Sequence, residues 1–403
     1  TSGVDTGASV TSGGDYVGGF VGKMINGTIT GSRTSSAVTA SAGTYVGGFV
    51  GEVAQTGTAT ISSSYATGAV AGNISVGGFV GSLAAGVINN TSYATGAVTG
   101  VQTVGGFVGF TLTNNSQITD AYATGNVTGT STSTSFDDSG ANIGGFAGII
   151  WNGADISNAY AAGNVTGAGY QVGGFAGYIG HTSNAANASS ITNSYATGNI
   201  TSTSGYVGGF AGRTFNKAII SDSFAKGNVT GGALIVGGFI GEIKNNSDLQ
   251  RNYAQGNVIG TTYVGGFAGN YVYTVAAEIP VFKYNSSTGT VTGTGPIVGG
   301  LIGSITGFAL ANPAEIYRSY STSTANGTTE VGGLIGYAKW VNIDQSFATG
   351  AVSATGATSN VGGFIGKYDF GGTIDDSYAQ GVVSGLSNVG GFIGFSNGSA
   401  AGA

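Results

Sequence analysis

The sequence has no cysteine, one histidine and three prolines among its 403 residues. Without cysteine there can be no disulfide framework, no thiolate nucleophile and no cysteine-based metal site. The single histidine, His181, has no second imidazole with which to build a transition-metal site or a catalytic pair. No other catalytic constellation is recognisable, so we expect neither an enzyme nor a bound cofactor.

Charged side chains are also scarce, at 7% of residues against about 25% in ordinary soluble proteins. The net charge is −6, and neither Lys nor Arg occurs between Arg33 and Arg213. Such a span has no cation with which to hold phosphates, which argues against nucleic acid and anionic membranes as partners. No run of about 18 apolar residues is present, so we expect no membrane insertion.

Glycine, by contrast, is abundant, with 80 residues, and many of them lie in one repeated motif. The motif begins as VGGFVG at residues 17–22 and recurs at intervals of 28–39 residues, most often near 29. Such a period predicts a single repeat domain over residues 1–403, in which each unit buries its apolar face by stacking on its neighbours. The 13 copies are centred on Phe20, Phe49, Phe79, Phe107, Phe146, Phe175, Phe210, Phe239, Phe267, Leu301, Leu334, Phe364 and Phe392.

A second element, IxxSYAxGxV, lies between successive glycine motifs and is clearest at residues 61–70. Its segments are rich in Val, Ile, Tyr and Thr, and a helix would lose about 1 kcal/mol for each glycine, so short strands are predicted. Three strands per repeat predict an all-β fold, a parallel β-solenoid (β-helix) of about 13 rungs with roughly 29 residues per rung. The general preference for right-handed crossovers favours a right-handed winding.

The apolar positions of both motifs have mixed parity, which a straight strand could not bury on one side. We therefore expect bends at the glycine pair, which can adopt conformations closed to other residues, and two residues before the Tyr. These bends would turn Phe, Ile, Tyr and Val toward one interior. The same alignment places Asp222 beside Arg251 on neighbouring rungs, where the two side chains are expected to pair. The turn-forming residues two before the Tyr or Phe are Asp120, Asn158, Asn193, Asp222 and Asp376.

The GGFVG core followed by the SYATG element resembles the GLUG-motif repeats of bacterial and archaeal surface proteins. The motif's Leu is mostly Phe here, with Leu retained at residues 299–303 and 332–336, and the resemblance covers nearly the whole chain. It implies a β-solenoid in a secreted or cell-surface protein, commonly a stalk or part of an adhesin. Some members also carry a zinc peptidase domain with an HExxH motif, which this chain lacks, so that activity is not implied.

A few polar residues invite a chemical role. Asp137–Asp138 and Asp375–Asp376 could supply oxygen ligands to Ca²⁺, although neither pair has an EF-hand spacing and solvated turn carboxylates are the favoured interpretation. Asn-x-Ser/Thr sequons recur at one place in the repeat, where they could carry glycans or form a ladder of stacked amides. These sequons begin at Asn126, Asn164, Asn199 and Asn228.

The two ends of the array carry the main functional hypothesis. Neither end shows a capping helix or a charged, proline-bearing strand, and solenoids without caps tend to associate. We expect head-to-tail joining into a rigid stalk or fibre outside the cell, with adhesion as its role. The expected edge residues are Tyr16, Val17 and Phe20 at one end and Val389, Phe392 and Phe395 at the other.

Two other functions stay open. A monomeric adhesin segment could bind polysaccharide or a host receptor through the aromatic residues of a long corner, although packing of that corner explains them better. Those residues are Tyr271, Tyr273 and Phe282. An ice-binding surface could form from a column of threonines in register, but that column is interrupted at Lys226, Gln255 and Gln380.

Overall fold

The computed structural model describes residues 3–55, 57–133, 140–181, 187–203, 205–232, 234–274 and 280–398. The regular elements in these ranges are all β-strands, with no helix that could cross a membrane. The strands stack in parallel as the turns of a β-solenoid, about 12 in all with about 30 residues per turn. The predicted fold class is therefore confirmed.

Two compact units divide the chain, and they interleave in sequence between residues 205 and 220. Unit 1 holds Thr1–Gly205, Phe210–Gly212 and Asn216–Ile219, and unit 2 holds the other residues. Each unit contains the same three parallel sheets. Sheet A is built from the IxxSYA segments, sheet B from the segments before the glycine pair, and sheet C from the segments that follow it.

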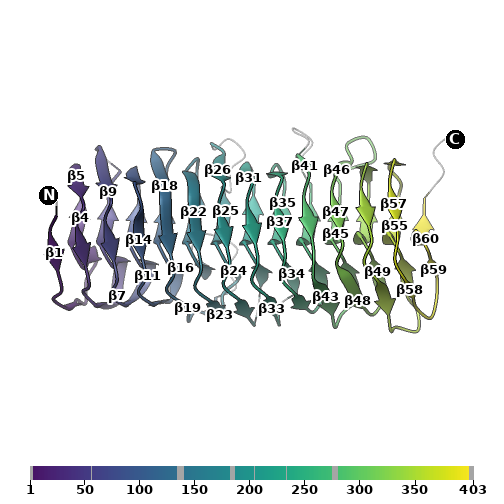
Figure 1. Cartoon of the computed structure of the whole chain (residues 1–403), viewed down its shortest axis with the longest axis horizontal. Helices are drawn as coiled ribbons and strands as arrows, with labels where there is room; N and C mark the ends of the chain where they lie inside the picture. Colours follow the sequence, from purple (N-terminus) through teal and green to yellow (C-terminus); the bar gives the residue numbers. More distant parts are fainter. Residues whose placement is uncertain are drawn as a thin grey trace. The chain divides into compact units, whose positions relative to one another are not determined.

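The strands of unit 1 are seen in the purple to teal part of Figure 1. Those of sheet A are β1 (Asp5–Thr6), β5 (Gly27–Thr30), β6 (Arg33–Thr34), β9 (Ala59–Ser62), β10 (Tyr65–Ala66), β13 (Gly86–Asn89), β14 (Ser92–Ala94), β18 (Ser116–Ala123), β22 (Asp155–Ala161), β26 (Ser189–Thr192) and β27 (Tyr195–Ala196). Those of sheet B are β2 (Val10–Thr11), β3 (Val17–Gly18), β7 (Val38–Gly47), β11 (Val70–Gly77), β15 (Val98–Gly100), β16 (Gln102–Gly105), β19 (Val127–Gly129), β20 (Asn142–Gly144), β23 (Val165–Gly167), β24 (Gln171–Gly173) and β28 (Ile200–Ser202). Those of sheet C are β4 (Val21–Met24), β8 (Val50–Val53), β12 (Val80–Leu83), β17 (Val108–Thr111), β21 (Ala147–Trp151) and β25 (Ala176–Gly180).

Unit 2 repeats this arrangement, and two strands, β30 (Ala211–Phe215) and β31 (Ala218–Ser221), contribute residues to both units. Its sheet A strands are β32 (Phe224–Ala225), β36 (Asp248–Gln250), β37 (Tyr253–Ala254), β41 (Phe282–Lys283), β42 (Ser286–Ser287), β46 (Ala314–Tyr317), β47 (Tyr320–Ser321), β51 (Val341–Asp344), β52 (Phe347–Ala348), β56 (Ile374–Asp375) and β57 (Tyr378–Ala379). Its sheet B strands are β29 (Tyr206–Gly208), β33 (Val229–Gly231), β34 (Ile235–Gly237), β38 (Val258–Gly260), β39 (Tyr263–Gly265), β43 (Thr290–Gly293), β44 (Ile297–Gly299), β48 (Thr324–Gly327), β49 (Glu330–Gly332), β53 (Val352–Ala354), β54 (Asn360–Gly362), β58 (Val383–Ser384) and β59 (Val389–Gly390). Its sheet C strands are β35 (Ile240–Lys244), β40 (Ala268–Val272), β45 (Ile302–Thr306), β50 (Ile335–Lys339), β55 (Ile365–Asp369) and β60 (Ile393–Asn397).

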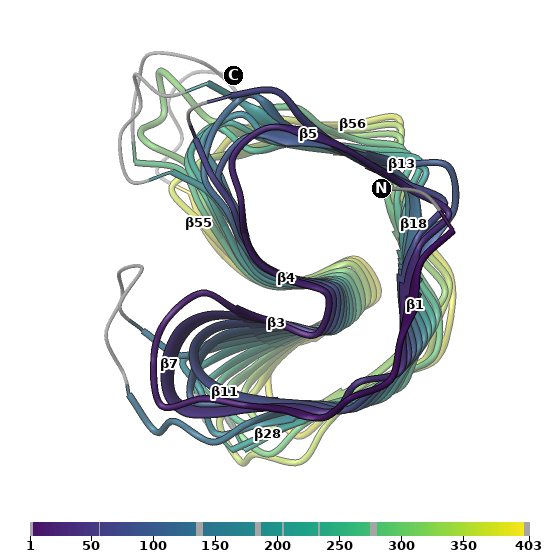
Figure 2. The ribbon, with the colours of Figure 1, turned by 90° about the vertical axis from the view of Figure 1, so that its left-hand side faces the viewer.

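The glycine motif folds each turn inward, as Figure 2 shows for β3 and β4 of the first turn. In the turn that follows, a Cβ added at Gly47 would overlap the carbonyl oxygen of Val50, and one at Gly48 would overlap that of Gly78 in the next turn. Among the described residues, no paired glycine of these motifs has a φ in the left-handed region. Glycine is required here by the close approach of backbones, which corrects the expectation of special backbone conformations.

The second bend lies where the sequence predicts it. Asp120, Asn158, Asn193, Asp222 and Asp376 all have φ between 44° and 54°, in the left-handed region that Asn and Asp tolerate better than most residues. The bend reverses the alternation, so that the residues on either side of the Tyr point inward and the Tyr itself is half-buried on the outer face. The expectation that Tyr shares the interior with Phe, Ile and Val is therefore wrong.

The interior of each turn is filled by columns of like residues in register. In unit 1 the motif phenylalanines from Phe20 to Phe210 stack with ring centroids 4.6–4.9 Å apart. A polar column runs inside sheet A of unit 2, where backbone Ser223 N donates to Asn252 Oδ1 at 3.0 Å and Asn252 N donates to Asn285 Oδ1 at 3.1 Å. The side-chain oxygens of Asn252 and Asn285 thus each accept from the backbone of the equivalent residue one turn away.

Candidate assembly edges and a polar groove

The first turn of unit 1 has strands that pair on one side only among the described residues, β3 with β7 and β4 with β8. Of the predicted edge residues, Val17 is buried, Phe20 is half-buried and Tyr16 is 40% exposed. The Phe20 ring stacks on Phe49 at 4.6 Å. A recess of about 650 Å³, lined by Phe20, Met24 and Ile29 among others, opens at this end of the core.

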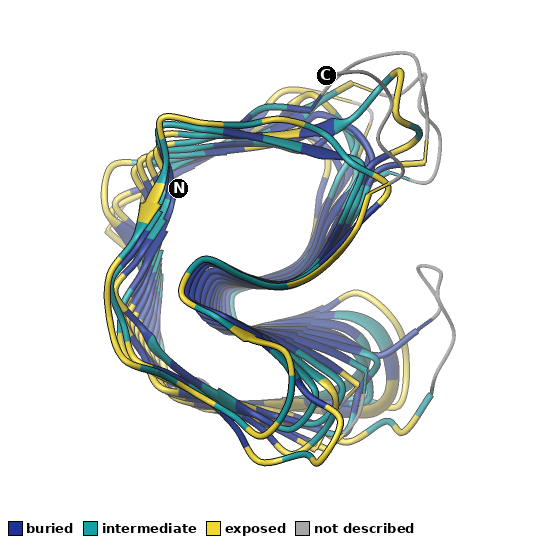
Figure 3. Ribbon diagram, turned by 90° about the vertical axis from the view of Figure 1, so that its right-hand side faces the viewer, coloured by how far each residue is buried: buried dark blue, intermediate teal, exposed yellow. Residues whose placement is uncertain are grey.

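The last turn of unit 2 is the counterpart, with β59 pairing to β54 and β60 to β55. Phe392 stacks on Phe364 at 4.6 Å and is half-buried, while Val389 and Phe395 are 47% and 39% exposed. Two further apolar side chains, Val382 and Leu386, are exposed in the same turn. In Figure 3 this turn faces the viewer in teal and yellow, whereas the motif strands behind it are dark blue.

The backbone gives the two edges opposite polarity. In unit 2, Phe364 N and Ile365 N both donate to Phe392 O of the next turn, at 2.8 and 3.0 Å. In unit 1, Phe20 N donates to Phe49 O in the same way, at 2.9 Å. N–H groups of the motif thus point to the following turn, and its carbonyl oxygens face the preceding one. By the same register, the N–H groups of Gly391, Phe392 and Ile393 in the last described turn point away from the turn before it.

The long corner after β40 does not offer its aromatic rings to solvent. Tyr271, Tyr273 and Phe282 are each at most 2% exposed, and Phe282 packs edge-on against Phe267 at 5.4 Å. Burial also raises the pKa of Tyr271 far above its ordinary value. These three residues therefore pack in the core of unit 2, as expected if the corner is held by packing, and present no surface on which a ligand could lie.

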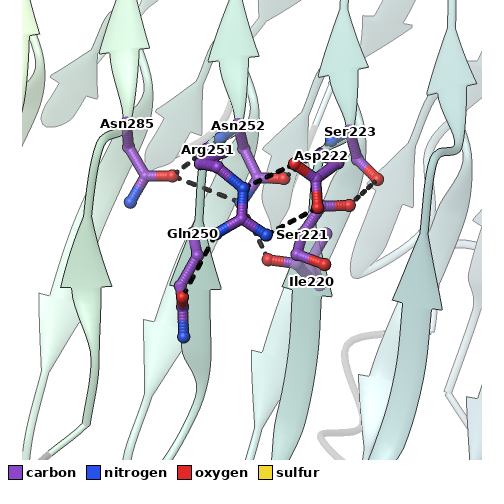
Figure 4. A network of polar contacts seen from close by, with 8 residues as sticks. All are labelled: Ile220, Ser221, Asp222, Ser223, Gln250, Arg251, Asn252 and Asn285. Atoms are coloured by element: carbon purple, nitrogen blue, oxygen red, sulfur yellow. Dashed lines mark hydrogen bonds and ion pairs between the residues drawn. The ribbon is translucent and has the colours of Figure 1, made fainter.

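Asp222 and Arg251 pair as the alignment predicts (Figure 4). The guanidinium donates from Nε to Asp222 Oδ1 at 2.6 Å and from Nη2 to Oδ2 at 2.7 Å. The hydrogen bond from Arg251 holds the pKa of Asp222 below its ordinary value. The repeat alignment is thus correct across these two turns.

The remaining polar candidates form no cation site among the described residues, in which no cluster of three acidic or histidine side chains could hold a metal. Asp375 and Asp376 are exposed, and Asp137–Asp138 lie outside the described residues. His181 packs edge-on against Trp151 at 5.0 Å. The sequon asparagines form a ladder of a different kind from the stacked amides expected, because the backbone Asn164 N donates to Asn126 Oδ1 at 2.9 Å.

Unit 2 contains a groove of about 430 Å³ that the repeat pattern of the sequence does not predict. It lies between sheets B and C, and its wall positions vary from repeat to repeat, so no motif marks it. Comparing the residues at equivalent positions of successive repeats could have revealed the groove from the sequence. The sheet B wall is lined by Tyr263, Ile297 and Glu330, and the sheet C wall by Asn270, Ser304, Tyr337 and Lys367.

Ion pairs flank this groove on the sheet C side. At one end Arg213 Nε lies 2.7 Å from Glu242 Oε2, and both residues are 5% exposed. At the other end Lys367 Nζ lies 3.0 Å from Asp369 Oδ2 and 3.8 Å from Glu330 Oε1. Burial raises the pKa of Glu330, and burial together with the charge of Asp369 raises the pKa of Tyr337 to about 12.

The repeated motifs, the parallel sheets and the columns of stacked rings define a β-solenoid repeat protein with a structural role. The GLUG motif model matches the chain four times, at residues 100–128, 139–166, 168–201 and 203–230. Residues 100–230 of the chain therefore carry GLUG repeats, as the resemblance predicts. No curated protein and no solved structure matches it.

Proposed function

We propose that this β-solenoid is a structural module of a secreted or cell-surface protein, which joins copies of itself end to end into a stalk or fibre that serves adhesion. The observation that carries the proposal is the opposite polarity of the two edges. By the register, N–H groups at Gly391, Phe392 and Ile393 point away from the preceding turn, and carbonyl groups of the first motif point away from the following turn, so each set suits pairing with a turn of another copy.

The side chains at the edges favour the same pairing. Phe392 of one copy would stack on Phe20 of the next with the 4.6–4.9 Å spacing that the inner column already has. The recess beside Phe20 would receive the exposed apolar groups of the last turn. Such a head-to-tail contact uses two different surfaces, so it does not close on itself and produces a filament.

The composition is compatible with a place outside the cell. A surface of Ser, Thr, Asn and Gly with 7% charged residues needs neither disulfides nor ion pairs, because the stacking of turns holds the fold. The GLUG repeats at residues 100–230 agree with such a setting. Self-association would then present many identical sheet faces along one fibre, which suits adhesion through weak repeated contacts.

Electron microscopy and sedimentation velocity across a concentration series test the proposal. We expect filaments whose length grows with protein concentration. The double variant Phe392→Lys and Phe395→Lys should weaken association by about 100-fold or more, because an unpaired ammonium buried in a contact costs about 3–5 kcal/mol.

A matched control adds the same two charges elsewhere, with Thr128→Lys and Thr166→Lys on exposed positions of sheet B in unit 1. This control should assemble like the wild type. Single particles of constant size at every concentration would refute self-association. Equal loss in both double variants would show that net charge, and not the edge contact, governs assembly.

A further inference from the structure

The groove of unit 2 is built by four successive turns. Register pairs Asn270 with Ser304, Ser304 with Tyr337 and Tyr337 with Lys367. Each residue along this wall therefore comes from the next strand of sheet C. On the opposite wall, Tyr263, Ile297 and Glu330 likewise come from successive strands of sheet B. With strands about 4.8 Å apart, the lined stretch is roughly 14 Å long. The groove thus suits an extended ligand that runs along the stacking direction.

Only side chains can recognise that ligand. The wall strands β40, β45 and β50 each pair with a neighbour on both sides, so their backbone groups are already bonded. A peptide that binds by adding a strand needs an open sheet edge, which these walls do not have. The ligand must therefore carry its own hydrogen-bonding groups along its length and match the side chains that line the walls.

Those side chains combine aromatic surface with neutral polar groups. Tyr263 and Tyr337 are half-buried, and each presents an apolar ring with a hydroxyl at its edge. Asn270 and Ser304 add an amide and a hydroxyl on the same wall, and Ile297 adds apolar surface opposite. A pyranose has the same two faces, an apolar C–H face that packs on aromatic rings and a rim of hydroxyls that donate and accept.

The charged side chains of the groove indicate which carbohydrates it could bind. Lys367 is the one cation lining the groove, and its ammonium already contacts both Asp369 and Glu330. The Arg213 guanidinium is likewise paired with Glu242, whose second oxygen lies 3.4 Å from Asn270 Nδ2. Among the described residues that line the groove, no cation outside these ion pairs is left for a carboxylate or sulfate on the ligand. An uncharged chain therefore fits the groove better than an anionic one.

We propose that the groove lined by Tyr263, Tyr337, Glu330 and Lys367 binds a segment of an uncharged polysaccharide. The tyrosine rings support the sugar faces, and Asn270, Ser304 and the Glu330–Lys367 pair bond to the hydroxyls. This site lies on the side of unit 2 and does not use the edge residues Phe392 and Phe395. Binding and end-to-end assembly are therefore separable, and a failure of one leaves the other standing.

Isothermal titration of the full chain with four uncharged oligosaccharides, from cellulose, starch, xylan and chitin, tests the site, with oligogalacturonate as the anionic comparison. At least one uncharged probe should bind, and the anionic probe should bind at least tenfold more weakly. Tyr337→Ala should weaken binding about tenfold or more, as the truncation of an aromatic anchor does. Tyr337→Phe keeps the ring and should retain most of the affinity.

The matched control is Tyr320→Ala, which removes a half-buried tyrosine of sheet A in the same unit. Its affinity should equal that of the wild type, and thermal melting checks that each variant is folded. If Tyr337→Ala does not fold, Lys367→Gln replaces it and should also lower affinity. The proposal is overturned if no uncharged probe binds, if the anionic probe binds better, or if Tyr320→Ala loses as much affinity as Tyr337→Ala.

Discussion

Two columns of aromatic rings run through unit 1 with nearly the same geometry and opposite surroundings. The inner column, from Phe20 to Phe210, has ring centroids 4.6–4.9 Å apart, and the outer column, from Tyr65 to Tyr195, has them 4.6–4.8 Å apart. From Phe49 onward the inner rings are fully buried, whereas the outer rings are half-buried. Stacking is thus imposed by the register of the turns and not by burial.

The difference separates two sources of stability that coincide in most cores. An inner phenylalanine gains from loss of contact with water and from stacking, whereas an outer tyrosine gains mainly from stacking and keeps its hydroxyl near solvent. Partial burial still raises the pKa of Tyr122 and Tyr160, so both rings stay protonated at neutral pH. The outer column is therefore a polar, uncharged surface.

The largest expected effect comes from breaking the inner column at Phe146, which lies 4.9 Å from Phe107 and 4.8 Å from Phe175. Phe146→Ala should lower the free energy of unfolding by about 3–5 kcal/mol, because the rigid turns cannot close the cavity. Urea denaturation followed by circular dichroism measures the loss, and hydrogen exchange at β20 and β21 localises it.

The chain provides its own control for this change, since Leu301 and Leu334 occupy the same motif position in unit 2. Phe146→Leu should therefore cost less than about 1.5 kcal/mol, in line with other swaps between large apolar groups. A cost for Phe146→Leu as large as that for Phe146→Ala would mean that ring stacking, and not filled volume, stabilises the interior.

Sequence reasoning succeeded where one residue type has one local consequence. The bend at Asp120 and the pairing of Asp222 with Arg251 both follow from position within the repeat, because parallel in-register turns place equivalent residues side by side. It failed to predict which way the outer tyrosines face. Whether a bend reverses the alternation of inward and outward side chains depends on its φ, which the sequence does not give. It also missed the groove, whose residues, such as Glu330 and Lys367, come from different turns and share no motif.

Substitution by Ala in the outer column should lower the free energy of unfolding less than in the inner column. Tyr122 lies 4.7 Å from Tyr93 and 4.8 Å from Tyr160, with ring planes within 6° of parallel. Tyr122→Ala should cost about 1–3 kcal/mol, because it removes two aromatic pairs that are each worth about 0.5–1.5 kcal/mol beyond area burial. The same urea experiment measures it, with hydrogen exchange read at β18 and β22.

Tyr122→Phe is the matched control, because Phe224 and Phe347 occupy this position in unit 2 and stack there on Tyr253 and Tyr320. The control should leave stability close to that of the wild type. If Tyr122→Ala instead destabilised the chain as much as Phe146→Ala, the distinction between the two columns would fail, and stacking alone would account for both.

The smallest effect is expected at the exposed pair of Asp222 and Arg251, near the stacked rings of Phe224 and Tyr253 in unit 2. Because the hydrogen bond from Arg251 lowers the pKa of Asp222, the pair stabilises the fold above the ordinary pKa of aspartate and loses this effect as pH falls through the folded value. Arg251→Gln should cost about 0–1 kcal/mol at neutral pH, less in high salt and nothing in strong acid. Titration of the Asp222 carboxyl by nuclear magnetic resonance should show its pKa rising toward the ordinary value in this variant. Arg251→Lys keeps the charge without the two-point contact and should give an intermediate pKa, whereas an unchanged pKa in Arg251→Gln would show that the pair does not persist in solution.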